Sequence, residues 1–545
     1  MPTTATAGAA QAPATDRRSI LLVFVGLMTA MLLSALDQTI FSTALPTIVG
    51  ELDGVDHMLW VTTAYILAAT IMMPVYGKLG DLIGRKSLFI GAIALFMAGS
   101  VVGGLAQGMT ELIVGRAIQG LGGGGLMILS QAIIADIVPA RERGRYMGVM
   151  GGVFALASVI GPLLGGWFTE SIGWRWCMWI NIPLGAVAIL SAILFLHPNA
   201  ERRERPRLDI AGMMLIAIAS AALVLFTSWG GGQYAWDSPV IIGLIVLTVI
   251  AAVAFVAVER RAAEPIMPLH LFAERNFTLT TAAGLLMGIA MFGTLAYMPT
   301  YLQMVAQVDA TSAGLLMIPM MGAMLPTSIV VGRAVSRTGR YRWYPIAGSV
   351  VIAAAMFLLS TMSATQPVWV TCAYLAVFGL GLGLQMQVLV LIVQNTFPLR
   401  MVGTATAANN YFRQIGASLG AAVVGSIFTN RLIALLAERA PGGGASLSDA
   451  NSLTPAAVRD LPQEIQDVIV GSYNDALAPV FLLIVPLALL SLVLLLFVKE
   501  EPLRTTLDVA PEAAEVGAGG PASVSGDDAG DTGRADDDQV VPARV

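Results

Sequence analysis

The chain reads ILLVFVGLMTAMLLSALDQTIFSTALPT over residues 20–47. Only one residue in this run, Asp37, carries a charge. About twenty consecutive apolar residues suffice to cross a bilayer as a helix. An ionised acid near the centre of such a helix costs roughly 2.5–3.5 kcal/mol on insertion scales. The run therefore predicts a membrane span. Because a charge inside a span is costly, the presence of Asp37 indicates that this acid has a function.

Composition places the rest of the chain in the membrane as well. Of its 545 residues, 56% are hydrophobic and 12% are charged, whereas soluble domains carry about 25% charged residues. Cys177 and Cys372 lie far apart in or near apolar runs and are expected to be free thiols. His57, His197 and His270 are scattered and form no metal-binding pattern. We therefore expect no metal, no cofactor and no nucleic-acid partner.

Apolar runs of about twenty residues recur along the chain. They lie near residues 20–47, 58–77, 87–106, 111–137, 145–168, 176–196, 208–228, 239–258, 277–304, 312–332, 343–363, 367–396, 403–430 and 476–498. The sequence thus predicts an all-α polytopic membrane protein with fourteen transmembrane helices. The first run is too long for a signal-peptide core, so we interpret it as an uncleaved span.

Loop charges orient these spans. Alternate loops carry basic residues, namely Lys78, Arg85, Lys86, Arg141, Arg143, Arg145, Arg202, Arg203, Arg205, Arg207, Arg260, Arg261, Arg275, Arg333, Arg337, Arg340, Arg342 and Arg400. The intervening loops carry mainly the acids Glu51, Asp53, Asp56, Glu170, Asp237 and Asp309. Cytoplasmic loops are enriched in Lys and Arg, so both termini are expected to be cytoplasmic in a cell membrane. The long external segment 431–475 is an exception, with Arg431, Arg439 and Arg459.

An internal repeat divides the spans. GKLGDLIGRK at 77–86 follows the second span, and GRAVSRTGRY at 332–341 follows the tenth. RAIQGLGGGGLMILSQ from Arg116 likewise matches VFGLGLGLQMQ from Val377. Two repeats around a site at the bilayer midplane are a common transporter architecture, although Gly-rich apolar segments also resemble one another by chance.

The loop 77–86 resembles the signature loop of the major facilitator superfamily. Its acid, Asp81, is expected to face the start of a helix near Gly403, where a carboxylate is stabilised. Asp136 is the expected partner of Arg85. We interpret these residues as a conformational switch formed by Gly77, Asp81, Gly84, Arg85, Lys86 and Asp136. A plain cytoplasmic loop is the simpler alternative.

Two further motifs fit the same superfamily. Arg116 with Gln119 and Gly120 matches its RxxQG element, although Arg116 could also extend toward the nearby membrane surface. The segment 151–166, GGVFALASVIGPLLGG, resembles the antiporter signature of the fifth span, which implies export rather than import. Its hinge residues would be Gly161, Pro162, Gly165 and Gly166, or they simply form a close-packing face.

Leu36–Pro46 and the segment WRWCMWINIP at 174–183 resemble the fourteen-span drug:proton antiporter family of the EmrB/QacA type. The resemblance covers about residues 20–498 and implies a major facilitator fold with two six-helix bundles and two inserted helices. The expected parts are an N-terminal tail 1–19, a bundle 20–197, inserted helices 198–276, a bundle 277–498 and a disordered tail 499–545. Ser42 replaces the usual Asn, and Ser336 stands at the position that matches Asp81.

Asp37 is the expected carrier of the coupled proton. Burial in lipid disfavours the ionised carboxylate, so a midplane acid can bind a proton from one side and release it on the other. Arg116, when close, would help to time that release. The alternative is a structural Asp37 held by hydroxyls such as those of Thr39 or Ser34. The proton gradient would then be the energy source, with no cofactor.

A mostly apolar cavity with a few polar groups would bind the substrate between the bundles. The candidates are Gln131, Tyr297, Gln303, Gln385, Gln387, Asn395, Asn409, Asn410 and Arg413. The predicted function is proton-driven export of lipophilic compounds, cationic drugs among them, by a monomer. A dedicated exporter of a lipid, siderophore or self-made antibiotic is the alternative. An enzyme or sensor is less favoured, because the chain lacks HExxH and P-loop motifs.

Overall fold

Helices dominate the architecture because the bilayer core offers no hydrogen-bond partner to an exposed backbone. The computed structural model describes residues 17–52, 57–196, 208–231, 233–439, 458 and 461–505. These residues all belong to one compact unit. Fourteen helices in the described part are long and apolar enough to cross a membrane, which confirms the predicted span count.

The first six spans are formed by α1 (Arg17–Glu51), α2 (Met58–Ile83), α3 (Arg85–Gly104), α4 (Met109–Ile137), α5 (Ala140–Trp167) with the π-helical η2 (Phe168–Ile172), and α6 (Trp176–Trp179) with α7 (Asn181–Phe195). We call them the first group. The last six spans, the second group, are formed by α10 (Arg275–Leu295) with α11 (Met298–Val305), α12 (Ala310–Leu315) with α13 (Ile318–Thr338), α14 (Trp343–Ser360), α15 (Val368–Thr396), α16 (Leu399–Arg439) and α18 (Gln463–Leu496).

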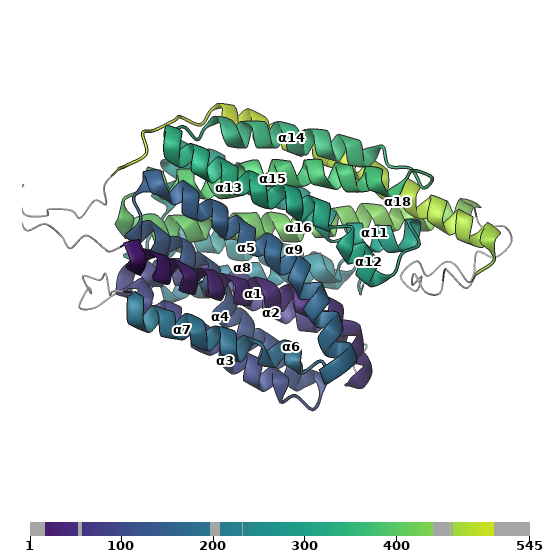
Figure 1. Cartoon of the computed structure of the whole chain (residues 1–545), viewed down its shortest axis with the longest axis horizontal. Helices are drawn as coiled ribbons and strands as arrows, with labels where there is room; N and C mark the ends of the chain where they lie inside the picture. The colour runs from purple at the N-terminus through teal and green to yellow at the C-terminus, as the bar shows by residue number, and fades with distance from the viewer. Residues whose placement is uncertain are drawn as a thin grey trace, which may run out of the picture. The chain divides into compact units, whose positions relative to one another are not determined.

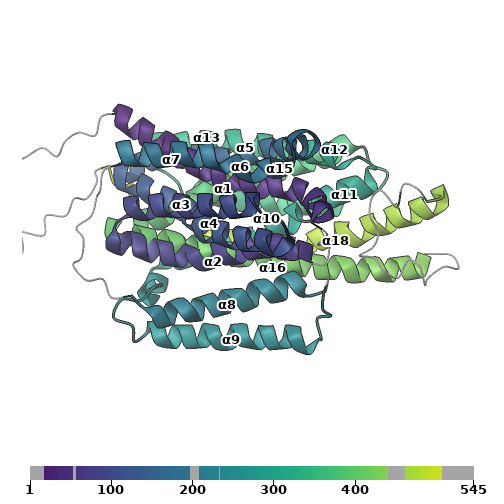
Figure 2. The same cartoon turned by 90° about the horizontal axis from the view of Figure 1, so that it is seen from below.

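Two helices lie between the groups in sequence and beside them in space. α8 (Ile210–Trp229) packs on α2 and α16, and α9 (Pro239–Glu259) packs on α8, as Figure 2 shows. Asp209 caps α8 by accepting from the Gly212 amide at 2.8 Å, and Ser238 caps α9 ahead of Pro239. The outer side of α9 exposes Ile242, Val246, Val249, Ile250 and Val253. Such an exposed apolar face suits contact with lipid.

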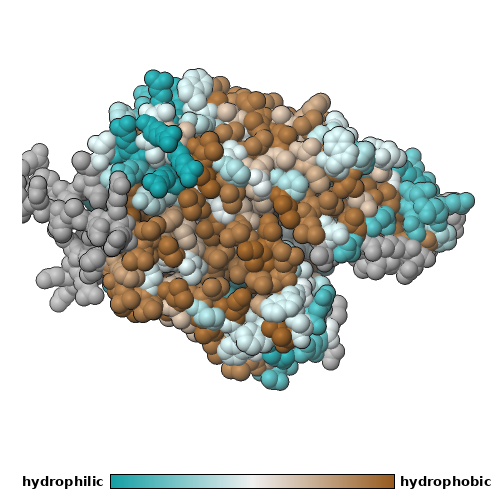
Figure 3. Space-filling model, viewed as in Figure 1, coloured by the Kyte–Doolittle hydropathy of each residue, from teal (hydrophilic) through white to brown (hydrophobic). Residues whose placement is uncertain are grey.

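Apolar side chains cover the middle of the helices, with polar patches toward the ends (Figure 3). The first and last helices of the chain distinguish the two ends of the spans. α1 begins and α18 finishes at the same end, on the left in Figure 1. We call this end the termini end and the opposite one the far end.

Glycines bring the two groups into close contact. A Cβ added to Gly77 on α2 would lie 2.3 Å from the Ala407 Cβ on α16. A Cβ added to Gly332 on α13 would lie 2.1 Å from the Gly144 carbonyl oxygen on α5. Small residues therefore allow direct backbone approach at both contacts.

The loops that form the predicted repeat each contain a glycine with a positive φ. Gly84 follows α2 with a φ of 95°, and Gly339 follows α13 with a φ of 73°. Residues with a side chain rarely adopt a positive φ, so glycine is favoured at both places. The aligned glycines thus share this requirement, although their ψ angles differ, 146° at Gly84 and −1° at Gly339.

Several helices are longer than their apolar runs. α5 begins at Ala140 rather than 145, α16 at Leu399 rather than near 403, and α18 at Gln463 rather than 476. Hydropathy marks only the part within lipid, whereas a helix continues through polar residues into water. In the segment 431–475, Arg439 and Asp475 join α16 to α18 through an ion pair of 2.8 Å.

Some predictions fall outside the described residues. They concern the tails 1–16 and 506–545, the loop acids Asp53 and Asp56, the basic residues Arg202, Arg203, Arg205 and Arg207, and Arg459. The expected domain boundaries also stay predictions.

We expect Gly332→Ala to destabilise the protein, because overpacking a tight contact costs about 1–3 kcal/mol. Gly322→Ala is the matched control on the same helix, since an added Cβ there meets nothing within 4 Å. The measurement is the thermal unfolding midpoint of the two purified variants. Equal midpoints would show that the contact between Gly332 and Gly144 is not tight.

Candidate functional site

Asp37 lies fully buried within α1, at 0% exposure. One carboxylate oxygen, Oδ2, forms an ion pair with Nη1 of Arg116 on α4. The other, Oδ1, accepts from Asn181 Nδ2 at 2.9 Å and from Gln119 Nε2 at 3.1 Å. Three donors therefore face the carboxylate, an arrangement that suits its ionised form.

A second layer of contacts fixes these donors. Arg116 Nη1 also donates to Gln119 Oε1 at 2.8 Å, so the amide nitrogen of Gln119 is left to face Asp37. Ser100 Oγ accepts from Gln119 at 2.7 Å and from Asn181 at 3.1 Å. The Arg116 guanidinium lies 4.3 Å from the ring centroid of Phe41 and 4.4 Å from that of Tyr65. Both cation–π contacts help to stabilise a charge buried in an apolar region.

The hydroxyls proposed as structural partners of Asp37 bind elsewhere. Thr39 Oγ1 donates to backbone carbonyls, including that of Ala157 at 2.9 Å. Ser34 Oγ forms a hydrogen bond with the Tyr65 hydroxyl at 3.0 Å. The alternative in which Thr39 or Ser34 holds Asp37 is therefore wrong, because both hydroxyls form hydrogen bonds with other groups.

Sequence reasoning missed two members of this network, Asn181 and Ser100. Both are polar residues within apolar runs, and both are fully buried at 0% exposure. Asn181 stands in the segment 174–183, which was used only to identify the family resemblance and not to predict site residues. Periodicity could not show that the start of α7, the first half of α4 and the end of α3 face the same point on α1.

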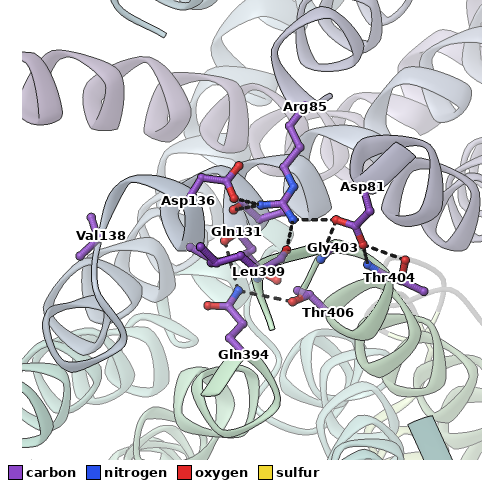
Figure 4. A network of polar contacts seen from close by, with 12 residues as sticks. Asp81, Arg85, Gln131, Asp136, Val138, Gln394, Leu399, Gly403, Thr404 and Thr406 are labelled. Atoms are coloured by element: carbon purple, nitrogen blue, oxygen red, sulfur yellow. Dashed lines mark hydrogen bonds and ion pairs between the residues drawn. The ribbon is translucent and has the colours of Figure 1, made fainter. Parts of the chain in front are cut away.

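A second network lies at the termini end (Figure 4). Arg85, at the start of α3, forms ion pairs with Asp136 of α4 and with Asp81 of α2, the latter at 2.6 Å. It also donates to the Ala132 carbonyl at 2.7 Å and to the Leu399 carbonyl at 3.1 Å. One guanidinium thus connects three spans of the first group to the start of α16.

Asp81 contacts the same helix directly. Its carboxylate accepts from the Gly403 amide at 3.1 Å, the Thr404 amide at 2.6 Å and the Thr404 hydroxyl at 2.8 Å. These amides lie near the positive end of the α16 dipole. Lys86, the last residue of this loop, donates to the Ile193 carbonyl at 2.9 Å.

The repeat places Ser336 in the equivalent position of the second group. Its hydroxyl accepts from the Arg145 amide, near the start of α5, at 3.0 Å. Asp81 and Ser336 thus make corresponding contacts to opposite groups. Arg143, which was not predicted as a site residue, adds a bond to the Gln394 carbonyl at 3.4 Å.

The predicted hinge packs against α1. A Cβ on Gly161 would lie 2.0 Å from Thr39 Oγ1, and one on Gly165 would lie 2.8 Å from the Ile40 carbonyl, whereas Gly166 has open space. Pro162 lies inside α5. The motif therefore joins two helices of the first group rather than the two groups, and its role as a hinge stays a prediction.

The substrate candidates separate into two sets. Gln131 and Asn410 meet across the groups at 2.9 Å, and Arg413 donates to Asn410 at 2.5 Å. Gln387 also faces the first group, because a Cβ on Gly151 would lie 3.3 Å from its Cγ. Four of the remaining candidates bond within the second group: Tyr297 to Ala421, Gln303 to Pro299, Gln385 to Ser491 and Asn409 to Thr281. The fifth, Asn395, donates to the Pro502 carbonyl, which follows α18.

A family model described as Major Facilitator Superfamily matches residues 27–421. The chain belongs to this superfamily. A transporter of Mycobacterium tuberculosis, strain H37Rv, named "Uncharacterized MFS-type transporter Rv1877", is 40% identical over 92% of this chain and 72% of its own. The multidrug transporter protein MdtP of Bacillus subtilis is 38% identical over 77% of each chain. Multidrug resistance protein 3 of the same organism is 33% identical over 90% of this chain and 97% of its own.

Solved structures of the superfamily share the fold at low identity. The human organic anion transporter MFSD10 aligns with a TM-score of 0.58 and 16% identity over 89% of this chain and all of its own. The proton:xylose symporter XylE aligns with a TM-score of 0.58 and 15% identity over 90% of this chain and 98% of its own.

Membership of the major facilitator superfamily confirms the predicted family and fold class. It makes the chain a multi-pass membrane transporter rather than an enzyme. The roles of the individual site residues stay predictions.

We expect Asp37 and Arg116 to be strongly coupled in stability. Removing one partner of a buried ion pair costs about 3–5 kcal/mol, because the other charge is left unpaired. Asp37→Asn and Arg116→Gln should each lower the free energy of unfolding, and the double variant should lose less than the sum. Arg175→Gln is the control, because its pair with Glu51 is exposed and worth at most about 1 kcal/mol. Additive losses would contradict the coupling.

We expect Asp81→Asn to loosen the start of α16, because the amide cannot replace both acceptor oxygens. Hydrogen–deuterium exchange in peptides that contain Gly403 and Thr404 should accelerate by roughly tenfold, as expected for losing a hydrogen bond to a charged group. Glu51→Gln, in an exposed ion pair at the far end, should leave these peptides unchanged. Unaltered exchange in Asp81→Asn would show that the Asp81 carboxylate does not stabilise the start of α16.

Proposed function

We propose that this superfamily member is a proton-coupled antiporter that exports lipophilic compounds by alternating access. The observation that carries the proposal is Asp37, an acid buried inside α1 and paired with Arg116. An ionisable residue at such a place in a span is typical of proton relays in transporters. Relatives named multidrug transporter and multidrug resistance protein support drug-like substrates.

The Asp37 network explains how a proton could change the conformation. The carboxylate accepts from Arg116, Asn181 and Gln119, which lie on α4 and α7. Protonation removes the negative charge that holds these three donors together, since a neutral carboxyl group attracts a cation far less. The helices that carry the donors are then free to shift, and Asp37 releases the proton when the ion pair forms again.

Orientation follows from the basic residues. The termini end carries Lys78, Lys86, Arg141, Arg145, Arg337 and Arg342. By the positive-inside rule this end is cytoplasmic, and so are both termini. The described hydrogen bonds that join the groups through Asp81, Arg85, Arg143 and Ser336 gather at this end. With this orientation, we propose that these bonds close the transport path toward the cytoplasm.

Efflux of Nile red, an uncharged lipophilic dye, from cells that express the protein tests the proposal. Wild-type efflux should stop when a protonophore collapses the proton gradient. Asp37→Asn should reduce efflux to the level of cells without the protein, because the amide cannot carry the proton. Glu51→Gln, in an exposed ion pair, should pump normally.

Two results would overturn the proposal. Efflux that persists in wild-type cells without a proton gradient would exclude proton coupling. Full proton-driven efflux by Asp37→Asn would exclude Asp37 as the proton carrier.

A further inference from the structure

Arg413 lies deep inside α16, well away from both membrane surfaces. It stands fourteen residues after Leu399, where the helix begins, which corresponds to about 21 Å of helix at 1.5 Å per residue. A bilayer core is about 30 Å thick, so this depth is within the hydrocarbon region. Its Nη2 donates to Asn410 Oδ1 at 2.5 Å and approaches Met127 Sδ, on α4 of the first group, at 3.9 Å. The cation therefore faces the interface between the two groups.

Two other arginines of the spans, Arg116 and Arg85, are neutralised by acids. Arg116 is paired with Asp37, and Arg85 with Asp81 and Asp136. Among the described residues, Arg413 forms no ion pair, and its side-chain partners are the amide of Asn410 and the thioether of Met127.

The sequence of the neighbouring helices explains this lack of an acid. α10, α15 and α8 contain no Asp or Glu. The acids of α2 and α4 lie near the helix ends: Asp81, Glu111 and Asp136. Those of α18, Glu464, Asp467 and Asp475, lie in its first half, and Asp475 is paired with Arg439. Arg413 cannot lose its proton in a protein. The middle of the interface therefore carries one uncompensated positive charge.

The first group of helices, which Arg413 faces, contains a buried side chain with a hydrogen-bond donor that is unpaired in the described part of the chain. Gln131 on α4 is fully buried, and its Oε1 accepts from Asn410 Nδ2 at 2.9 Å. Its Nε2 has no hydrogen-bond partner among the described residues. A buried donor without an acceptor is costly. Among the described residues, Arg413 and Gln131 thus present, from the two groups, a guanidinium without an acid partner and an amide N–H without an acceptor.

We infer that Arg413 and Gln131 form an anion-binding site in the transport path, and that the exported compounds are lipophilic acids, such as carboxylates. This inference rests on the proposed export function. It reverses the cationic preference that a buried Asp37 suggests by itself, because Arg116 already neutralises Asp37. The planar guanidinium binds a carboxylate through two parallel hydrogen bonds. A lipophilic cation would instead approach an unpaired positive charge.

Three pyrene probes of nearly equal shape test the charge preference. They are 1-pyrenebutyrate, its uncharged methyl ester and the cationic 1-pyrenebutylamine. Binding to the purified full chain in detergent is measured by energy transfer from tryptophan to pyrene. The butyrate should bind at least about tenfold more tightly than the amine, as expected for a hydrogen bond to a charged group. Equal or tighter binding of the amine by the wild-type protein would overturn the inference.

Two variants locate the site. Arg413→Gln should weaken butyrate binding by about tenfold or more and leave ester binding unchanged, which also shows that the variant is folded. Arg413→Lys should bind butyrate with an affinity between those of the wild type and Arg413→Gln, because lysine keeps the positive charge but lacks the planar guanidinium. Gln131→Glu places an acid opposite Arg413 and should remove the preference for butyrate even if Arg413→Gln does not fold. Butyrate binding that is unchanged in both Arg413→Gln and Gln131→Glu would contradict the site.

These binding measurements need no proton gradient, and Nile red efflux involves no charged substrate. A failed charge preference with normal proton-driven Nile red efflux would overturn only the anion site. Retained charge preference without proton-driven efflux would overturn only the proton-coupled function.

Discussion

The hydrocarbon core of a membrane provides no hydrogen-bond partners, and the interior of this transporter follows from that constraint. Helices satisfy the backbone, so the polar side chains must satisfy one another. Asp37 is surrounded by three donors, and Arg85 lies between two acids. Among the described residues, Arg413 has no acid partner and Gln131 Nε2 has no hydrogen-bond acceptor. The proposed anion site at the interface between the groups rests on these two missing partners.

The two groups meet through corresponding but unequal contacts. On one side Asp81 binds amides of α16 as a carboxylate, and on the other Ser336 binds an amide of α5 as a hydroxyl. Hydrogen bonds to an ionised acceptor are roughly twice as strong as neutral ones. The α2–α16 contact is therefore the stronger electrostatic connection, whereas α5 and α13 rely on the backbone approach at Gly144 and Gly332.

Helix α5 links the buried acid to this interface. Thr39, two residues after Asp37, donates to the Ala157 carbonyl of α5. Nearer the start of the same helix, a Cβ on Gly148 would lie 2.6 Å from the Ser328 carbonyl of α13. Helix α5, packed against both α1 and the opposite group, thus provides a continuous physical connection between the neighbourhood of Asp37 and the interface.

The sequence by itself determined the fourteen spans, the superfamily and the ionisable residues within the spans, because hydropathy and motifs are local properties of a chain. Only the tertiary structure decided which side chains meet. Asn181 and Ser100 join Asp37, Thr39 and Ser34 do not, and Arg413 faces the other group without an acid. The reason is rotational: a helix that is apolar nearly all round shows no sequence period that tells which face points inward. The depth of a residue can thus be read from the chain, whereas its partners depend on how neighbouring helices are turned and packed.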